Sequence, residues 1–208
     1  MLAVALTCTL VAAVVNWYTR VRSHQRLETV SKPLTTILVI WVAIAAGGAR
    51  TPTVLVVIGL VCCLAGDIAL LDAVDRFVVG LAAFLVGHIV FIAMFATLHL
   101  KRPAWGIVAA ILLAVHAAVI GRRIVVGAAQ KDRALRVPVT AYLLVISAMT
   151  VVAVMTGRAW AVAGAIAFVA SDTLLGWRAF VRERSWMSLA VMVTYHAALV
   201  GLALSLRT

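Results

Sequence analysis

Two aspartates, Asp67 and Asp172, lie inside long apolar stretches of a chain that has only 7 acidic residues. An ionised carboxylate costs about 2.5–3.5 kcal/mol at the centre of a membrane helix, so such residues are rare and usually functional. The remaining acids lie in polar gaps, where water can solvate them: Glu28, Asp72, Asp75, Asp132 and Glu183. Because two carboxyl groups can share the work of a general acid and a base, we predict that Asp67 and Asp172 are catalytic.

Both aspartates lie close to the same end of their apolar stretches. At a helical rise of about 1.5 Å per residue, Asp67 lies about 6 Å from the end at Leu71, and Asp172 lies about 7–8 Å from the end at Trp177. Other polar residues fall in the same half or near mid-membrane, and we predict that they bind substrate: Asn16, Lys32, His88, Ser171, Tyr195 and His196. This distribution predicts a polar pocket that opens to one face of a membrane.

Each of these residues also has a purely structural interpretation. An aspartate near a helix end can reach water or pair with a loop arginine, and an intramembrane histidine can be a hydrogen-bonded packing residue. The matched depth of Asp67 and Asp172, each after a small residue, favours the functional interpretation for the pair.

The elements that hold these residues are predicted to be membrane helices. Hydrophobic residues make up 65% of the chain and charged residues 12%, whereas a soluble domain is about half apolar and about a quarter charged. The net charge of +11 comes from basic residues in short gaps between apolar runs. That placement is typical of membrane topology rather than of nucleic-acid binding, so no nucleic-acid partner is expected.

Eight apolar runs are long enough, or nearly so, to cross a bilayer, which takes about 20 residues. We predict an all-α integral membrane protein, a bundle of about eight transmembrane helices in a single domain over residues 1–208. Prolines, glycines and charge clusters, among them Pro33 and the gap at 121–136, are expected to mark the helix ends. The predicted spans lie at about 2–19, 33–49, 52–71, 77–99, 104–120, 137–156, 159–177 and 186–206.

Loop charge predicts the orientation of the bundle. The gaps that follow the odd-numbered spans hold 13 of the 18 basic residues. The positive-inside rule then places these gaps in the cytoplasm and both termini outside.

The two halves of the chain carry similar short segments. Asp67 lies in AGDIALL (65–71) and precedes His88 by 21 residues, while Asp172 lies in ASDTLLG (170–176) and precedes His196 by 24. With four spans in each half, this similarity suggests two parallel four-helix repeats related by an axis along the membrane normal.

A resemblance to a known family rests on five segments, which occur in this order along the chain: KPLTT (32–36), AGDIALL (65–71), GLAAFLVGHIVFIAMF (80–95), ASDTLLG (170–176) and TYHAALV (194–200). The chain resembles the YhhN-like lysoplasmalogenases, a family of eight-helix membrane proteins. It departs from the family's pattern at Phe91, where a tyrosine is common, and after Tyr195, where a glutamine is missing and His196 is the polar group at hand.

The resemblance implies an enzyme of the cell membrane that cleaves the vinyl-ether bond of a lysophospholipid. The products would be a fatty aldehyde and a glycerophospho-headgroup. A vinyl ether is hydrolysed by protonation at carbon, which gives an oxocarbenium-like cation that water captures. One carboxylic acid can donate the proton while a carboxylate stabilises the cation and activates water, much as in glycosidases. This chemistry calls for no metal and no cofactor.

Three other functions stay open at this point. Asp67, His88, Asp172 and His196 include residue types that bind zinc, so a metal-dependent lipid hydrolase or amidase is one alternative. A non-enzymatic lipid or small-molecule transporter is another, although transporters place polar groups at the midplane and on both sides. In a structural membrane protein, both aspartates would be dispensable. The sequence does not indicate the oligomeric state.

Overall fold

The computed structural model describes residues 1–22, 24–47 and 50–207. The helices are α1 (Leu2–Arg22), α2 (Gln25–Gly47), α3 (Thr51–Ala69), α4 (Phe77–Thr97), α5 (Pro103–His116), α6 (Arg122–Lys131), α7 (Arg136–Thr156), α8 (Ala159–Phe180) and α9 (Ser185–Leu204). A π-helical turn, Ala117–Gly121, joins α5 to α6, and a 3-10 turn, Arg133–Leu135, precedes α7.

Within these described ranges, eight helices are long and apolar enough to cross a membrane when α5 and α6 are taken as one span, and there is no strand. The prediction of an all-α bundle of eight membrane helices is therefore confirmed, and the chain is a multi-pass membrane protein. The predicted internal repeat stays a prediction.

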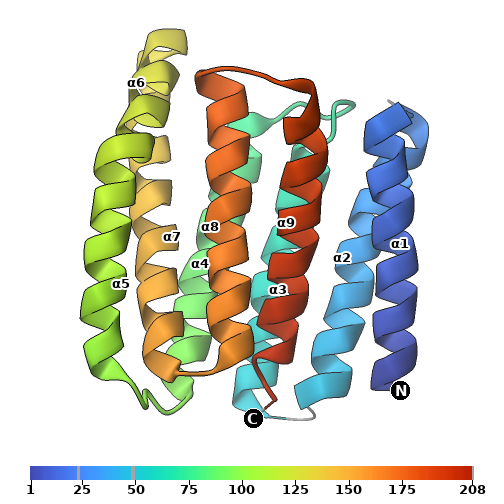
Figure 1. Cartoon of the computed structure of the whole chain (residues 1–208). Helices are drawn as coiled ribbons and strands as arrows, with labels where there is room; N and C mark the ends of the chain where they lie inside the picture. The colour runs from blue at the N-terminus through green and yellow to red at the C-terminus, as the bar shows by residue number, and fades with distance from the viewer. Residues whose placement is uncertain (23, 48–49, 208) are drawn as a thin grey trace.

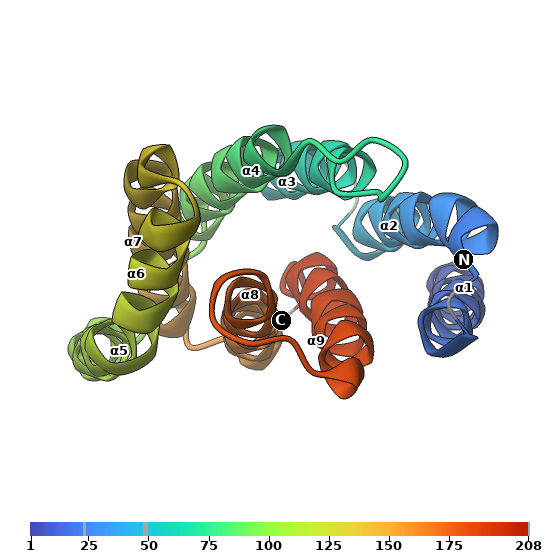
Figure 2. The same cartoon turned by 90° about the horizontal axis from the view of Figure 1, so that it is seen from above.

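The helices run side by side, and both termini lie at one end of the bundle (Figure 1). Seen from above, the helices lie around an arc in the order α1, α2, α3, α4, α7 and α5, with α6 over α7, and α8 and α9 lie within the arc (Figure 2). The carboxyl ends of α3 and α8, which carry Asp67 and Asp172, lie at the end of the bundle away from the termini.

Two expectations about helix ends are wrong. Pro33 lies inside α2, which begins at Gln25 rather than at residue 33. A proline can interrupt a membrane helix without ending it, because neighbouring helices and Ser/Thr side chains can satisfy the freed backbone groups. The predicted end of this span, residues 48–49, lies outside the described residues.

The gap expected at 121–136 is mostly helical. α6 occupies residues 122–131, and its Ile124 and Ala128 are buried in a small apolar cluster with Val139 of α7. Helical spacing places Ile124 and Ala128 on one face, and their burial against the bundle explains why a segment with several charges continues as a helix.

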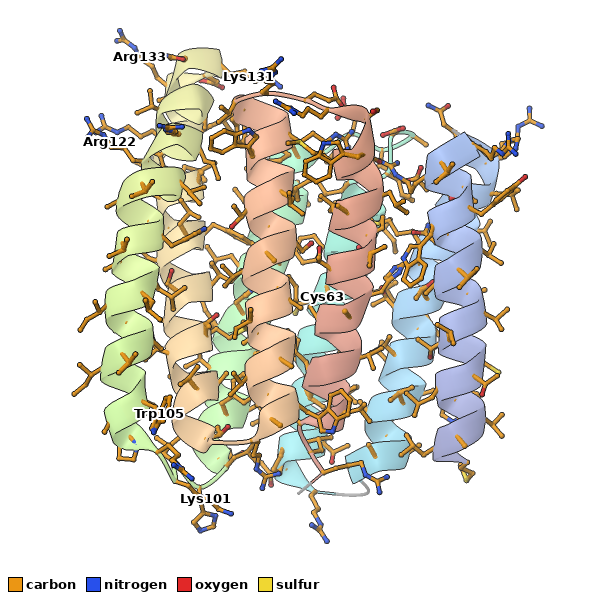
Figure 3. All side chains as sticks on the ribbon, in the orientation of Figure 1. Cys63, Lys101, Trp105, Arg122, Lys131 and Arg133 are labelled. Carbon is orange, nitrogen blue, oxygen red and sulfur yellow. The ribbon has the colours of Figure 1, made fainter. Side chains whose placement is uncertain are left out.

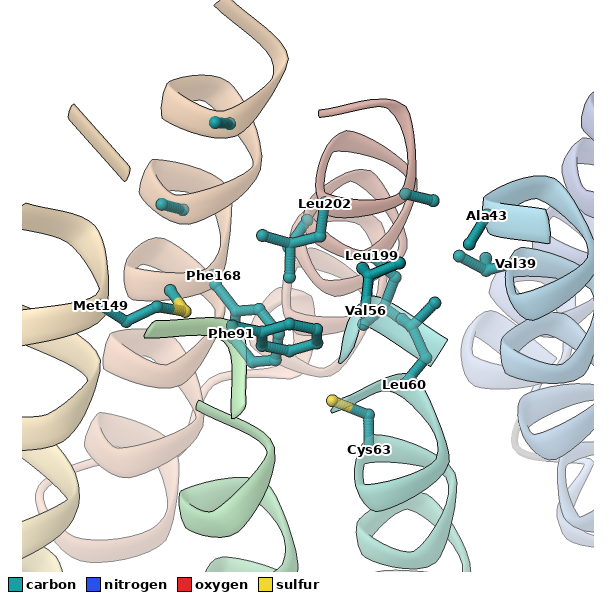
Figure 4. Close-up of a cluster of buried hydrophobic side chains, with 14 of the residues drawn as sticks. Val39, Ala43, Val56, Leu60, Cys63, Phe91, Met149, Phe168, Leu199 and Leu202 are labelled. Carbon is teal, nitrogen blue, oxygen red and sulfur yellow. The ribbon is translucent and has the colours of Figure 1, made fainter. Parts of the chain in front are cut away.

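A buried apolar core holds the bundle together beside the site. Phe91 of α4, Met149 of α7, Phe168 of α8 and Leu202 of α9 meet there, each fully shielded from solvent (Figure 4). Such interiors are packed as densely as organic crystals, so the helices have little freedom to shift. The helices that carry the polar residues are therefore fixed relative to one another.

α8 and α9 approach each other backbone to backbone at Gly164 and Gly201. A Cβ atom added to Gly201 would lie 2.6 Å from Gly164 Cα. Small residues permit such close approach between membrane helices.

We expect Gly201→Val to destabilise the protein by about 1–3 kcal/mol, the usual cost of overpacking. Thermal denaturation in detergent should show this as a lower midpoint. Gly121→Ala is the control, because the nearest atom to its Cβ would be a movable Leu143 side-chain carbon, at 3.3 Å, and the other neighbours would lie at ordinary contact distances. Equal midpoints for wild type and Gly201→Val would show that this contact does not hold α8 against α9.

Candidate active site

A cavity of about 320 Å³ lies among the ends of α2, α3, α4, α8 and α9, on the side of the bundle away from the termini. Its inner part brings together residues that are far apart in the sequence. Five of the eight residues predicted to form the site line this cavity: Lys32, Asp67, Ser171, Asp172 and Tyr195.

Asp67 lies in a setting suited to a carboxylate ion. Its Oδ2 atom accepts hydrogen bonds from the Thr36 hydroxyl at 2.6 Å and from the Tyr195 hydroxyl at 2.8 Å. Lys32 Nζ lies 3.5 Å from Oδ1, and the Asp67 side chain is only 1% exposed. A buried charge persists only when it is paired and hydrogen-bonded, and Asp67 has both kinds of partner.

Asp172 lies in a different setting. Its Oδ2 atom accepts a hydrogen bond from the Tyr142 hydroxyl, and its side chain is 11% exposed toward the cavity. Among the described residues, the one basic group within ion-pairing distance is His88, whose Nε2 atom lies 3.9 Å from Oδ2. Since no Lys or Arg compensates a charge there, Asp172 is suited to the neutral, protonated form.

His88 is held in one orientation beside Asp172. Its Nδ1 atom lies 2.5 Å from the carbonyl oxygen of Phe84, which can only accept a hydrogen bond. Nδ1 therefore carries the proton, and Nε2 of the neutral ring faces Asp172 as an acceptor. The ring packs edge-on against Phe168 at a centroid distance of 4.5 Å, which ties the site to the apolar core.

The remaining residues predicted to bind substrate hold helices together. The Ser171 hydroxyl donates to the Val191 carbonyl oxygen at 3.2 Å and links α8 to α9. Asn16 Nδ2 donates to the Ser31 hydroxyl at 3.0 Å, and His196 Nδ1 accepts from Trp17 Nε1 at 3.0 Å. Asn16, His88 and His196 are not among the residues that line the cavity.

The cavity mouth carries charges of both signs. Arg20 pairs with Glu28 at 2.5 Å, and Arg178 pairs with Glu183 at 2.8 Å. Further charged residues at the mouth are Asp72, Asp75 and Lys131.

A narrow apolar slot continues from the cavity between α4, α7 and α8, beneath α6. Asp172 lies at the junction of slot and cavity. The slot has about 40 Å³ of space, and apart from Asp172 and the Tyr142 hydroxyl its lining is apolar or glycine. The residues that line both spaces are Leu70, Phe77, Phe84, Asp172 and Leu175.

Sequence reasoning missed two of the groups that contact the aspartates. Thr36 belongs to the KPLTT segment but was not among the residues predicted to bind substrate. Tyr142 was not singled out, although it is one of only 3 tyrosines and lies in a predicted span. The available signal was its position, since Tyr142 lies near the end of its predicted span that is on the same side of the membrane as Asp172.

The arrangement provides one carboxyl group with partners suited to a carboxylate and one carboxyl group suited to protonation around a single cavity. Such a pair can protonate a substrate and stabilise the cation that results. In the described part of the chain, no three or more His, Cys, Asp or Glu side chains form a group that could hold a metal ion.

Comparisons with known proteins point to one family. The YhhN family model matches residues 27–206. Two curated relatives, both called "Lysoplasmalogenase", come from Mycobacterium bovis and Mycobacterium tuberculosis, and each is 34% identical over 127 residues. The match covers 59% of this chain and 48% of each relative, so it spans about half the length of those proteins. No solved structure gives a significant match.

Proposed function

The chain belongs to the YhhN family, and from this premise we propose that it is a membrane-embedded hydrolase that cleaves the vinyl-ether bond of lysoplasmalogen-type lysolipids. The observation that carries the proposal is the contrast between the two aspartates of one cavity. Asp67 is paired with Lys32 and two hydroxyl donors, whereas Asp172 has no Lys or Arg partner among the described residues.

The contrast assigns a role to each carboxyl group. Asp172 donates its proton to the alkenyl carbon that is not bonded to oxygen, and the double-bond electrons form the new C–H bond. The resulting oxocarbenium cation is stabilised by the Asp67 carboxylate, which also takes a proton from the attacking water. Lys32, Thr36 and Tyr195 hold Asp67 in place for this step.

The hemiacetal formed by water then collapses. Asp67 returns its proton to the glycerol oxygen as the C–O bond breaks, and the hemiacetal hydroxyl gives its proton to Asp172. One water is consumed, the aldehyde and the glycerophospho-headgroup are released, and both carboxyl groups recover their starting forms.

The surroundings of the aspartates support a lysolipid as substrate. The charged mouth suits a polar headgroup, and the apolar slot beside Asp172 suits the hydrocarbon next to the vinyl ether. The positive-inside rule further suggests that the mouth faces the cytoplasm of a cell-membrane protein, with both termini outside.

Incubation of the purified protein with matched lysolipids tests the proposed reaction. The panel holds chain length and headgroup constant and varies only the linkage between alkenyl ether, alkyl ether and acyl ester. We expect fatty aldehyde from the alkenyl ether alone. Fatty acid from the ester would instead favour a hydrolase of the esterase or amidase kind, and loss of activity to a chelator with recovery on adding zinc would favour the metal-dependent alternative.

A further inference from the structure

A larger hollow lies outside the active site, on the outer side of the bundle. It is a groove of about 1270 Å³ between the π-helical turn and α6 on one side and α7 on the other. It touches the site region only through Leu143, which also lines the apolar slot. The proposed reaction makes no use of this groove.

All charged residues that line the groove are arginines. Arg122 belongs to α6, Arg133 to the turn after it, and Arg136 to the start of α7. All three are exposed, and none forms an ion pair with another described residue. Figure 3 shows Arg122 and Arg133 at the outer side of α6, near the end of the molecule where the active-site cavity opens. This end of the groove is a concentrated positive site.

The rest of the groove is apolar. Val126, Val137 and Leu144 are 47%, 74% and 64% exposed, and small residues such as Ala141 line it as well. Leu144 follows Arg136 by about two turns of α7, which places it closer to the middle of the helix. The groove thus combines a cationic end with an apolar wall that continues into the membrane.

α6 packs one face against the bundle and lines the groove with another. Its Ile124 and Ala128 are buried against the bundle, while Arg122 and Val126 line the groove. The helix projects beyond the neighbouring helix ends (Figure 1). Lipid headgroups surround the ends of membrane-spanning helices, so they are expected beside α6. Arginine binds phosphate with a planar fork of donors, and basic pockets between membrane helices bind anionic headgroups.

We propose that this groove binds a phospholipid with a net negative headgroup. Arg122, Arg133 and Arg136 contact the phosphate, and the acyl chains lie against Val126, Val137 and Leu144. Charge complementarity commits the site to an anionic lipid, because no acidic residue lines the groove in the described part of the chain. The nearest acid in sequence, Asp132, instead accepts a hydrogen bond from the backbone nitrogen of Ala134 at 2.9 Å.

Native mass spectrometry of the full chain tests this site. The probes are dioleoyl phosphatidylglycerol and dioleoyl phosphatidylcholine, which share their chains and differ in net charge. The wild type should retain phosphatidylglycerol in preference, and the triple variant Arg122→Gln, Arg133→Gln, Arg136→Gln should lower that preference at least about tenfold. The control triple variant, Arg26→Gln, Arg182→Gln, Arg184→Gln, removes as many charges from the same end of the bundle and should bind like wild type.

A second variant tests the groove rather than its charge. Thr140 is exposed and lines the groove, so the indole of Thr140→Trp should obstruct the path of the acyl chains and lower phosphatidylglycerol retention while all three arginines remain. Equal binding of the two lipids by the wild type would overturn the proposal. So would equal losses in the two triple variants, or full retention by Thr140→Trp.

Discussion

Replacing Asp172 with asparagine is expected to lower the turnover of an alkenyl lysolipid by at least about 100-fold, as is usual when a positioned acid is removed. Asparagine keeps the size of the side chain and can still accept the hydrogen bond from Tyr142. It cannot deliver a proton to carbon. The amide is neutral, as is the protonated carboxyl group that it replaces, so its burial should cost little more and the variant should fold.

Asp132→Asn is the matched control for this variant. The same chemical change is made in the loop before α7, at a carboxylate that lines neither the cavity nor the slot. Turnover by Asp132→Asn should stay within a few-fold of wild type. If Asp172→Asn inserts normally and still releases aldehyde at the wild-type rate, Asp172 is not the acid.

The second large effect is expected at Asp67. Asp67→Asn should also cost at least about 100-fold in turnover, because the amide carries no charge to stabilise the cation and cannot take a proton from water. The double variant with Asp172→Asn should be little worse than the poorer single variant, since groups that act as a unit are not additive. Steady-state rates of aldehyde release from the three variants measure this.

Tyr195→Phe separates the charge of Asp67 from its hydrogen bonding. It removes one of the two hydroxyl donors to Asp67 but leaves the carboxylate and Lys32 in place. We expect a much smaller loss than for Asp67→Asn. If Asp67→Asn is poorly expressed but its folded molecules have normal activity, Asp67 has a structural role rather than a catalytic one.

Much of the site could be predicted because burial of charge in a membrane is costly. That cost singles out Asp67 and Asp172, and the helical rise places them at the same end of their helices. Both lie in one cavity, together with Lys32 and Tyr195. The eight spans were predictable because the length of an apolar run is enough to identify a membrane helix.

Other features depend on contacts that a single sequence does not reveal. The hydroxyl of Tyr142 reaches Asp172 only because α7 packs against α8, and a tyrosine within a span could as well have faced lipid. α6 is stabilised by Ile124 and Ala128 at the bundle surface, a tertiary effect that its charged sequence conceals. Asn16 and His196 have suitable polarity and depth, but their contacts link helices α1, α2 and α9.

The most direct test of the proposed carbon protonation is hydrolysis of an alkenyl lysolipid in D2O, with the aldehyde analysed by mass spectrometry. The acid exchanges its proton with solvent before it reacts, so the product should carry one deuterium on the carbon next to the carbonyl. Unlabelled aldehyde incubated with Asp172→Asn in D2O controls for exchange after release and should stay unlabelled. Aldehyde released by the wild type without deuterium at that carbon would contradict the proposed mechanism.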